Sequence, residues 1–206
     1  FNFFKISLEG LSSTYAAFGL DPVFIDTISS TEATAVAGMK SALVHAEDAW
    51  RDTRSYDSFI GHMKKAQSGK DLSASGREML MTGWDEPSGH AVGFVFNQEK
   101  DGNFIYACNA GDAKDPSRSI VKYEVKDFDK MIRFFRRCSH NNNETRAFFV
   151  GKPSQWGLRR SPESKQLPES IDKASQKRGN CPIASRKTCL LAMLWSSSRA
   201  EGVKPK

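Results

Sequence analysis

The sequence has no long apolar run, few cysteines and no paired-cysteine motif. No stretch of its 206 residues approaches the roughly 18 consecutive apolar residues of a membrane-spanning helix, so we expect no membrane insertion. Its four cysteines include no CxxC pair, and their density is far below that of a disulfide-stapled scaffold. The composition, with 39% hydrophobic and 26% charged residues, is that of a folded protein with a substantial core.

The cysteine spacing is also a poor match to a metal site. The one close pairing of cysteine and histidine is Cys138 with His140, and it lacks the second pair of ligands of a structural zinc site. We therefore expect neither a metal nor a cofactor. Free thiols are typical of a reducing compartment, which predicts a cytoplasmic location. In that setting, one reactive cysteine with a distant histidine is a candidate nucleophile.

Lysine and arginine outnumber the acidic residues by 30 to 24, and the excess is concentrated late in the chain. A basic face can bind nucleic acid or an acidic partner. No nucleic-acid-binding module is recognisable in the spacing, and a solvated surface is the simpler interpretation. We therefore do not expect nucleic acid as the partner.

The apolar pattern divides the chain into a helical N-terminal part, residues 1–70, and an α+β core, residues 71–206. Residues 31–67 have helical spacing, with a break predicted within 52–57. The first residues, FNFFKISLEG, lack an initiator methionine and the layout of a signal peptide, so we expect a fragment of a longer protein.

The core is predicted to contain strands, a short helix, a loop and a final buried helix. Strand composition occurs at 78–84, 90–96, 104–108, 119–125 and 146–150. The second and third of these form a hairpin around the turn signal at 101–103. A helix is expected at 127–138 and an exposed loop at 152–178. An apolar segment near the C-terminus then indicates a buried helix with Pro182 at its first position.

Three residues have the surroundings that a cysteine nucleophile requires. Cys181 falls at or next to the N-cap of the last helix, where aligned N–H groups lower a thiol pKa and can stabilise an oxyanion. His90 opens an apolar strand directly after Gly89. Asn109, 19 residues after His90, falls at the same open end of the hairpin, where its side-chain oxygen can orient the imidazole.

Alternatives stay open for each of these residues. Cys181 can be an ordinary buried thiol, as Cys189 is expected to be, and His90 can be a structural histidine. Asp112 is the alternative to Asn109 as the third residue, although the sequence Asn-Ala-Gly-Asp also suits a turn.

The order His, Asn, Cys resembles that of the circularly permuted papain-like cysteine enzymes. That clan includes ubiquitin-like-protein proteases, adenovirus-type proteases, and bacterial effector acetyltransferases and deubiquitinases. The stretch SQKRGNCPIAS resembles the Gln-x-x-Gly-Asn-Cys segment of bacterial effectors, some of which are ankyrin-associated. The stretch GWDEPSGHAVGFVF resembles their His-bearing strand. The gap of 72 residues from Asn109 to Cys181 departs from the compact members of the clan.

The resemblance implies a papain-like α+β fold, with a central antiparallel sheet packed on a buried helix headed by the nucleophile Cys181. It implies a cysteine peptidase that cleaves a protein substrate, a ubiquitin-like or host protein, through an acyl-enzyme. Gln176 and Asn180 would contribute to the oxyanion hole. An effector acyltransferase using the same site and a non-catalytic protein-interaction domain are the alternatives. The resemblance also implies a bacterial effector delivered to the host cytosol.

Overall fold

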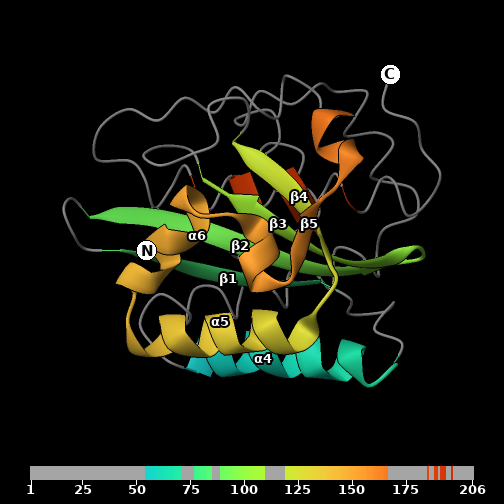
Figure 1. Ribbon diagram of the computed structural model, residues 1–206, viewed down its shortest axis with the longest axis horizontal. Coiled ribbons are helices and arrows are strands. Elements are labelled where there is room, and N and C mark those ends of the chain that lie inside the picture. Colours follow the sequence, from blue (N-terminus) through green and yellow to red (C-terminus); the bar gives the residue numbers. More distant parts are fainter. Residues whose placement is uncertain are drawn as a thin grey trace, which may run out of the picture.

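The computed structural model describes residues 54–70, 77–84, 89–109 and 119–166, together with positions 185, 188, 189, 191–193 and 196. An antiparallel five-stranded sheet forms its centre (Figure 1). The strands lie in chain order across the sheet: β1 (Arg77–Trp84), β2 (His90–Glu99), β3 (Gly102–Cys108), β4 (Ile120–Val125) and β5 (Leu158–Arg160). With the helices described below, the architecture is α+β, as predicted.

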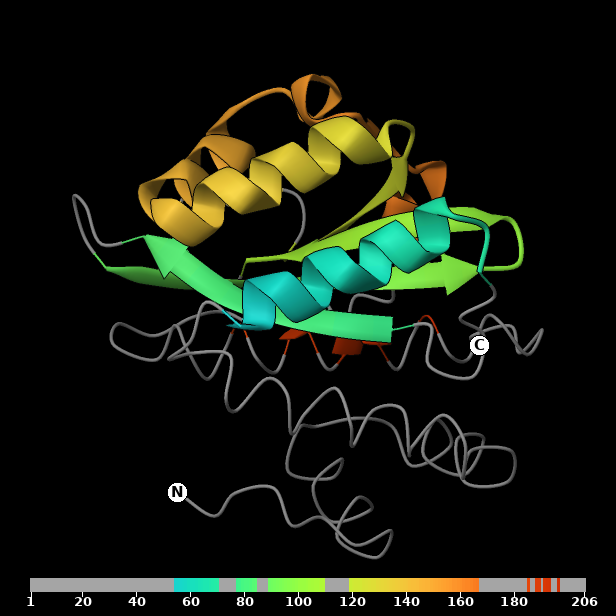
Figure 2. The same ribbon diagram turned by 90° about the horizontal axis from the view of Figure 1, so that it is seen from below.

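Two helices, α4 (Arg54–Gln67) and α5 (Phe128–His140), lie side by side on one face of the sheet (Figure 2). Phe59 of α4 and Phe135 of α5 meet with their ring centroids 4.9 Å apart, and Phe135 contacts Phe94 of β2 at 5.1 Å. A third helix, α6 (Asn143–Val150), joins this layer through Phe148, whose ring lies 5.0 Å from that of Phe94. The main hydrophobic core lies between these helices and the sheet.

Helix α5 follows closely from its sequence. Asp127 is its N-cap and accepts a hydrogen bond from the Lys130 N–H at 2.9 Å, which satisfies one of the unpaired donors of the first turn. Its buried residues recur with the spacing of one helical face: Met131, Ile132, Phe134, Phe135 and Cys138. No helix in the described part of the chain is long and apolar enough to cross a bilayer.

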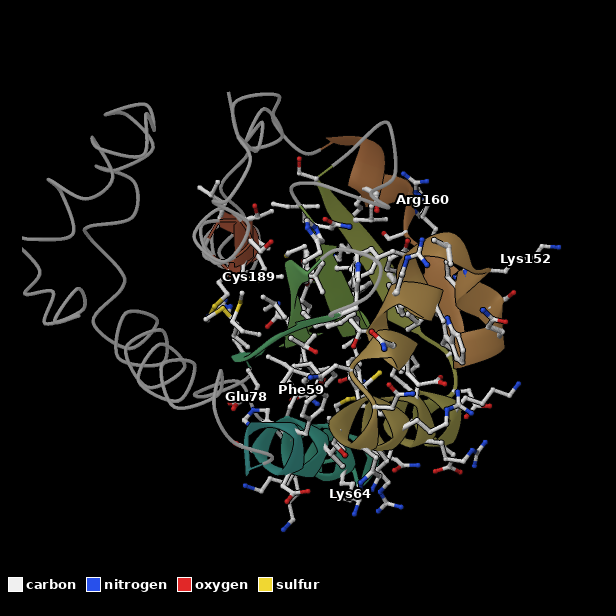
Figure 3. All side chains as sticks on the ribbon, turned by 90° about the vertical axis from the view of Figure 1, so that its left-hand side faces the viewer. Phe59, Lys64, Glu78, Lys152, Arg160 and Cys189 are labelled. Atoms are coloured by element: carbon white, nitrogen blue, oxygen red, sulfur yellow. The ribbon has the colours of Figure 1, made fainter. Side chains whose placement is uncertain are left out.

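The described positions between 185 and 196 are all helical, and we call them the C-terminal helical segment. They pack on the face of the sheet opposite α4 and α5, and Figure 3 shows Cys189 and Phe59 on different sides of the strands. Ser185 Oγ donates a hydrogen bond to the Ala91 carbonyl at 2.6 Å, and Arg77 Nε donates to Ser196 Oγ at 3.2 Å. The segment therefore runs along β2 in the same direction, and its N-terminal end lies where β2 begins.

Gly93 of β2 allows this close packing. A Cβ at Gly93 would lie 2.1 Å from Cys189 Sγ and 3.1 Å from Met81 Sδ. The next residue, Phe94, faces the opposite way into the α4–α5 core, because side chains alternate along a strand. Alternate residues of β2 therefore belong to two separate packing layers.

We expect Gly93→Ala to destabilise the chain by about 1–3 kcal/mol, the usual range for overpacking a filled site. The new methyl group would lie 2.1 Å from the Cys189 sulfur, so Cys189→Ala in the same chain should restore most of the loss. Urea midpoints of both single variants and of the double variant measure this coupling. Strictly additive effects would contradict the packing of the segment against β2.

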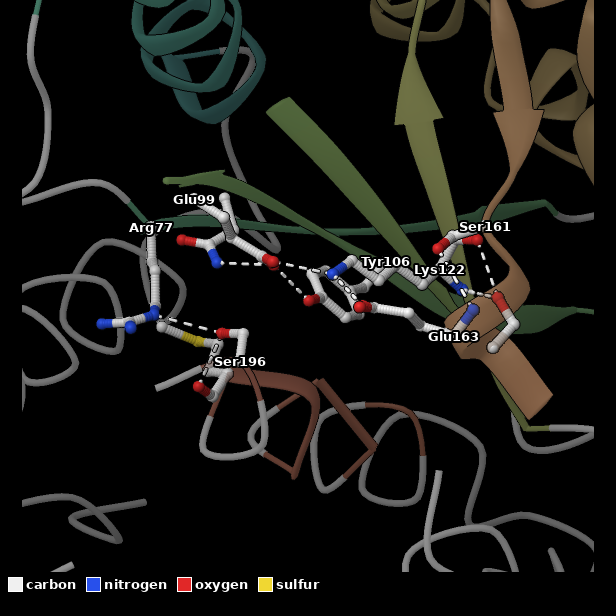
Figure 4. Close-up of polar contacts among 10 residues, drawn as sticks. Arg77, Glu99, Tyr106, Lys122, Ser161, Glu163 and Ser196 are labelled. Atoms are coloured by element: carbon white, nitrogen blue, oxygen red, sulfur yellow. Dashed lines mark hydrogen bonds and ion pairs between the residues drawn. The ribbon is translucent and has the colours of Figure 1, made fainter. Parts of the chain in front are cut away.

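A buried network of charged and aromatic side chains lies on the face of the sheet that the C-terminal helical segment covers, near one end of the strands (Figure 4). Lys122 Nζ is 2.7 Å from Glu99 Oε2 and 2.6 Å from Glu163 Oε2, and the lysine side chain is only 1% exposed. The ammonium also lies 3.8 Å from the centre of the Phe104 ring, and the Tyr106 hydroxyl donates to Glu99. The network joins β2, β3 and β4 to the 3-10 helix η2 (Pro162–Gln166).

Two serines complete the backbone hydrogen bonding of β4 beyond the short strand β5. The Ser161 N–H donates to the Lys122 carbonyl at 2.9 Å. Ser164 Oγ accepts from the Lys122 N–H at 2.9 Å and donates to its carbonyl at 2.8 Å. Both backbone groups of Lys122 are therefore paired, although β5 ends before it reaches this residue.

The prediction of a strand at 146–150 is wrong, because these residues belong to α6. Asn141 Oδ1 accepts from the Asn143 N–H at 3.1 Å and orders the chain before the helix. Thr145 and Phe148 are buried three residues apart, which is the spacing of one helical face rather than of a strand.

The prediction of an exposed loop at 152–178 is also wrong over its first half. This half contains the 3-10 helix η1 (Pro153–Trp156), then β5 and η2. Leu158 is buried, and the Trp156 ring lies 4.8 Å from that of Phe134 in α5. Residues 167–178 lie outside the described residues.

The remaining strand predictions and the helix predicted at 127–138 differ only at their ends, whereas the predicted start of the last helix at Pro182 lies outside the described residues. The hairpin of β2 and β3 is confirmed, but Glu99 pairs with Gly102, so its turn is shorter than predicted. Helix α4 begins at Arg54, within the predicted break at 52–57. The helical prediction for residues before 54 lies outside the described residues.

Candidate active site

His90 and Asn109, predicted to meet at the open end of the hairpin, are hydrogen bonded to each other. His90 Nε2 lies 2.8 Å from Asn109 Oδ1. The two residues are only 7% and 2% exposed, so little water competes for this bond. Their predicted proximity is confirmed, whereas the catalytic roles assigned to them stay a prediction.

The pairing of β2 with β3 brings these two side chains together. Gly93 is opposite Cys108, and this register places Asn109 on the same face as His90, one strand across. The Asn109 N–H donates to the Ser119 carbonyl at 2.9 Å, which holds the chain after β3 against the start of β4. The amide is thus positioned by the sheet itself.

Trp84 covers His90 from the neighbouring strand. It lies directly opposite His90 in the β1–β2 register, and the two ring centroids are 4.8 Å apart. Gly83 permits this approach, since a Cβ there would lie 2.0 Å from the His90 carbonyl oxygen. Trp84 was not predicted as a site residue. The sequence between β1 and β2 does not indicate how the two strands pair, so it could not show that Trp84 lies opposite His90.

The hydrogen bond determines which imidazole nitrogen can act as a base. An amide oxygen only accepts, so Nε2 of His90 carries the proton in this pair, and Nδ1 of the neutral ring holds the free lone pair. A proton taken up at Nδ1 makes an imidazolium that Asn109 Oδ1 stabilises through the same hydrogen bond. The pair therefore has the arrangement of a general base with an orienting amide.

The other predicted site residues lie outside the described residues: Cys181, Asp112, Gln176 and Asn180. Among the residues that the structure does describe, no group of three or more His, Cys, Asp and Glu side chains is placed to hold a metal ion. The described residues thus include an imidazole held by an amide oxygen, and the cysteine predicted as the nucleophile lies outside them.

The three described thiols are poorly suited to be that nucleophile. Cys108, Cys138 and Cys189 are all buried. Burial raises the pKa of the Cys138 thiol to about 12. Burial also raises the pKa of the Cys108 thiol well above its ordinary value, and the adjacent Cys189 adds to this increase. A thiol attacks as the thiolate, so neither Cys108 nor Cys138 is activated at neutral pH.

No protein-family model matches this sequence, and no curated protein and no solved structure matches it. The function that we assign therefore depends on the geometry of the described residues and on the sequence around Cys181.

Proposed function

We propose that this chain is a papain-like cysteine peptidase of the host or bacterial cytosol, in which Cys181 is the nucleophile, His90 the general base and Asn109 the residue that orients it. The hydrogen bond between His90 Nε2 and Asn109 Oδ1 is the observation that carries the proposal. It leaves Nδ1 of the ring for the thiol proton, as a Cys-His-Asn mechanism requires. The substrate would be a protein, with a ubiquitin-like or host protein as the first class to test.

The direction of the C-terminal helical segment supports Cys181 as the partner of this base. Ser185 contacts Ala91 at the start of β2, next to His90. Cys181 precedes Ser185 by four residues, and a helix that extends back over this interval rises by about 6 Å. Such a helix would begin at the same end of the sheet as β2.

The segment and the His90–Asn109 pair belong to opposite faces of the sheet. Side-chain alternation places His90 on the face of Phe94, whereas Cys189 contacts Gly93 on the other face. The thiol would therefore approach Nδ1 around the end of the sheet, beside the exposed Gly89. The first residue of a strand is the position where such an approach from the other face is shortest.

The proposed reaction uses each residue in turn. The Cys181 thiol transfers its proton to His90 Nδ1, and the thiolate attacks the carbonyl carbon of the scissile peptide bond. The imidazolium then protonates the leaving amine as the C–N bond breaks, which leaves a thioester on Cys181. Water, deprotonated by His90, attacks the thioester, releases the carboxylic acid and restores the thiol. Backbone N–H groups at the helix N-terminus, with Gln176 and Asn180, would bind the oxyanion.

Selective alkylation tests this proposal directly. With limiting iodoacetamide at pH 7, we expect Cys181 to be modified at least about tenfold faster in the native chain than in denaturant, because an activated thiol is largely thiolate at this pH. The three buried thiols should react more slowly in the native chain than in denaturant. Mass spectrometry of the digested chain gives the rate at each site. In denaturant, all four cysteines should react at similar rates.

Cys181→Ser is the matched control, and it should remove the fast phase without changing the slow one. A Cys181 rate in the native wild-type chain that is no higher than its rate in denaturant would contradict the peptidase and favour the protein-interaction domain. Cleavage of a proteome-derived peptide library by the wild-type chain, and not by Cys181→Ser, would then identify the reaction.

Asn109→Ala is expected to lower kcat/KM on such a substrate by about 10- to 100-fold. A hydrogen bond to a charged group contributes about 1.5–3 kcal/mol, and the partner here is the imidazolium of the reaction. Asn109→Asp keeps the acceptor oxygen, so it should recover most of the loss. A merely structural Asn109 would instead give equal activity in Ala and Asp variants of equal stability, compared by urea unfolding.

A further inference from the structure

A cleft of about 640 Å³ opens beside Asn109, the hydrogen-bond partner of His90. This volume lies in the range of ligand-binding sites in proteins. Asn109 lines the cleft and also holds the His90 imidazole, so a molecule bound in the cleft would be separated from the proposed base by one side chain. The cleft extends from Asn109 across β4 to β5, and is bounded by the C-terminal end of α6 and by η1.

The floor of the cleft is apolar and aromatic. Val121 and Tyr123 of β4 and Phe148 and Phe149 of α6 contribute to it, and all except the half-buried Phe149 are buried. Such a surface can accept an apolar side chain, since burial of a valine- to phenylalanine-sized group away from water is favourable.

The rim of the cleft is basic. It carries Lys152, Arg159 and Arg160, all exposed, and Figure 3 labels Lys152 and Arg160 on the same side of the molecule. Arg159 Nε donates to Glu124 at 3.0 Å, so part of its charge is neutralised. Among the described residues that line the cleft, none is acidic. The described rim of the cleft is therefore basic, and its exposed cations are the charges that an arriving ligand meets.

We propose that this cleft binds an acidic segment of the protein substrate, next to the scissile bond. One apolar side chain of that segment would rest on the aromatic floor, and its carboxylates would face Lys152 and Arg160. The inference rests on the proposed function, because it assigns the cleft to the substrate of the same site. Opposite charge on the rim also speeds encounter with an acidic segment and disfavours a basic one.

Binding can be tested apart from catalysis. The full chain with Cys181→Ala is titrated into a short fluorescein-labelled peptide in which leucines alternate with glutamates, and anisotropy is recorded. Controls replace the glutamates with glutamines or the leucines with asparagines, and both should bind more weakly. Lys152→Glu combined with Arg160→Glu should weaken binding at least about fivefold, because two exposed attractions become repulsions.

Arg133→Glu combined with Arg136→Glu is the matched control. These exposed arginines of α5 lie outside the cleft, and their reversal changes the net charge by the same amount. An unchanged affinity in this control, with loss in the cleft variant, supports the site. An equal loss in both would overturn it in favour of a general charge effect. Tighter binding of a single-stranded DNA oligonucleotide than of the acidic peptide would also overturn it.

Cleavage and binding then separate the two proposals. Binding of the acidic peptide with the expected variant pattern, but no cleavage of any library peptide, would overturn the peptidase and keep the cleft as an acidic-peptide site. Cleavage that depends on Cys181 and His90, but shows no preference for acidic residues near the cut, would keep the peptidase and overturn the cleft assignment.

Discussion

His90→Gln is expected to slow peptide cleavage by about 10⁴-fold, the upper end of what a general base contributes. Glutamine fills a similar volume beside Trp84 and can still hydrogen bond to Asn109, so the fold should persist. Its amide cannot take up the thiol proton at neutral pH, however, and Cys181 would lose its base. Steady-state cleavage of the best library peptide, with urea unfolding as a check of the fold, measures the effect.

The pH dependence of Cys181 alkylation gives a readout that a structural role of His90 would not change. Loss of the imidazolium removes the positive partner of the thiolate, so the Cys181 pKa should rise toward the ordinary thiol value of about 8.5. Below that pH, the alkylation rate of the His90→Gln variant should fall by about tenfold per pH unit, whereas the wild-type chain stays reactive in mild acid. Identical pH profiles in the two chains would remove His90 from the mechanism.

Lys122→Met is expected to destabilise the chain by about 3–5 kcal/mol, the cost of removing one member of a buried ion pair. Methionine fills much of the same space, so the loss would come mainly from leaving Glu99 and Glu163 close together without their cation. The lysine side chain is almost fully buried, and solvent therefore screens the carboxylates poorly. Urea unfolding at pH 7 measures the difference.

Lys126→Met is the matched control for this prediction. Lys126 also pairs with a carboxylate, that of Glu124, but its side chain is 47% exposed. An exposed pair of this kind contributes about 0–1 kcal/mol, and the loss should become smaller still in high salt. Equal losses at Lys122 and Lys126 would show that the burial of the first pair has no energetic consequence.

The hairpin and α5 could be predicted from the sequence because each has a strong local signal. An apolar run before and after the turn signal at 101–103 defines both strands, and the observed pairing, with Lys100 and Asp101 in the turn, brings Asn109 to the face of His90. Helix α5 has an acidic N-cap and a regular apolar face. Short-range rules are sufficient where the partners lie within one supersecondary unit.

The two wrong predictions show where those rules are insufficient. Residues 146–150 form a short apolar run with aromatic residues, whose composition alone does not distinguish a strand from a buried helix. Strand β4 already pairs with β3 on one side and β5 on the other. Residues 146–150 therefore have no place beside it as a strand, and they pack on the sheet as part of a helix. Strand β5 is only three residues long and has one buried apolar side chain, Leu158, so it left no periodicity to detect.

The serine pair beside β4 has a consequence for self-association. An unpaired strand edge offers N–H and C=O groups that another chain can extend into an intermolecular sheet, a common route to aggregation. At Lys122 these groups are already occupied by Ser161 and Ser164, while the lysine side chain itself is buried in the network with Glu99 and Glu163. Loss of the Ser164 hydroxyl would remove two of these three hydrogen bonds and leave the Ser161 N–H paired with the Lys122 carbonyl, so the protection of this edge would be weakened.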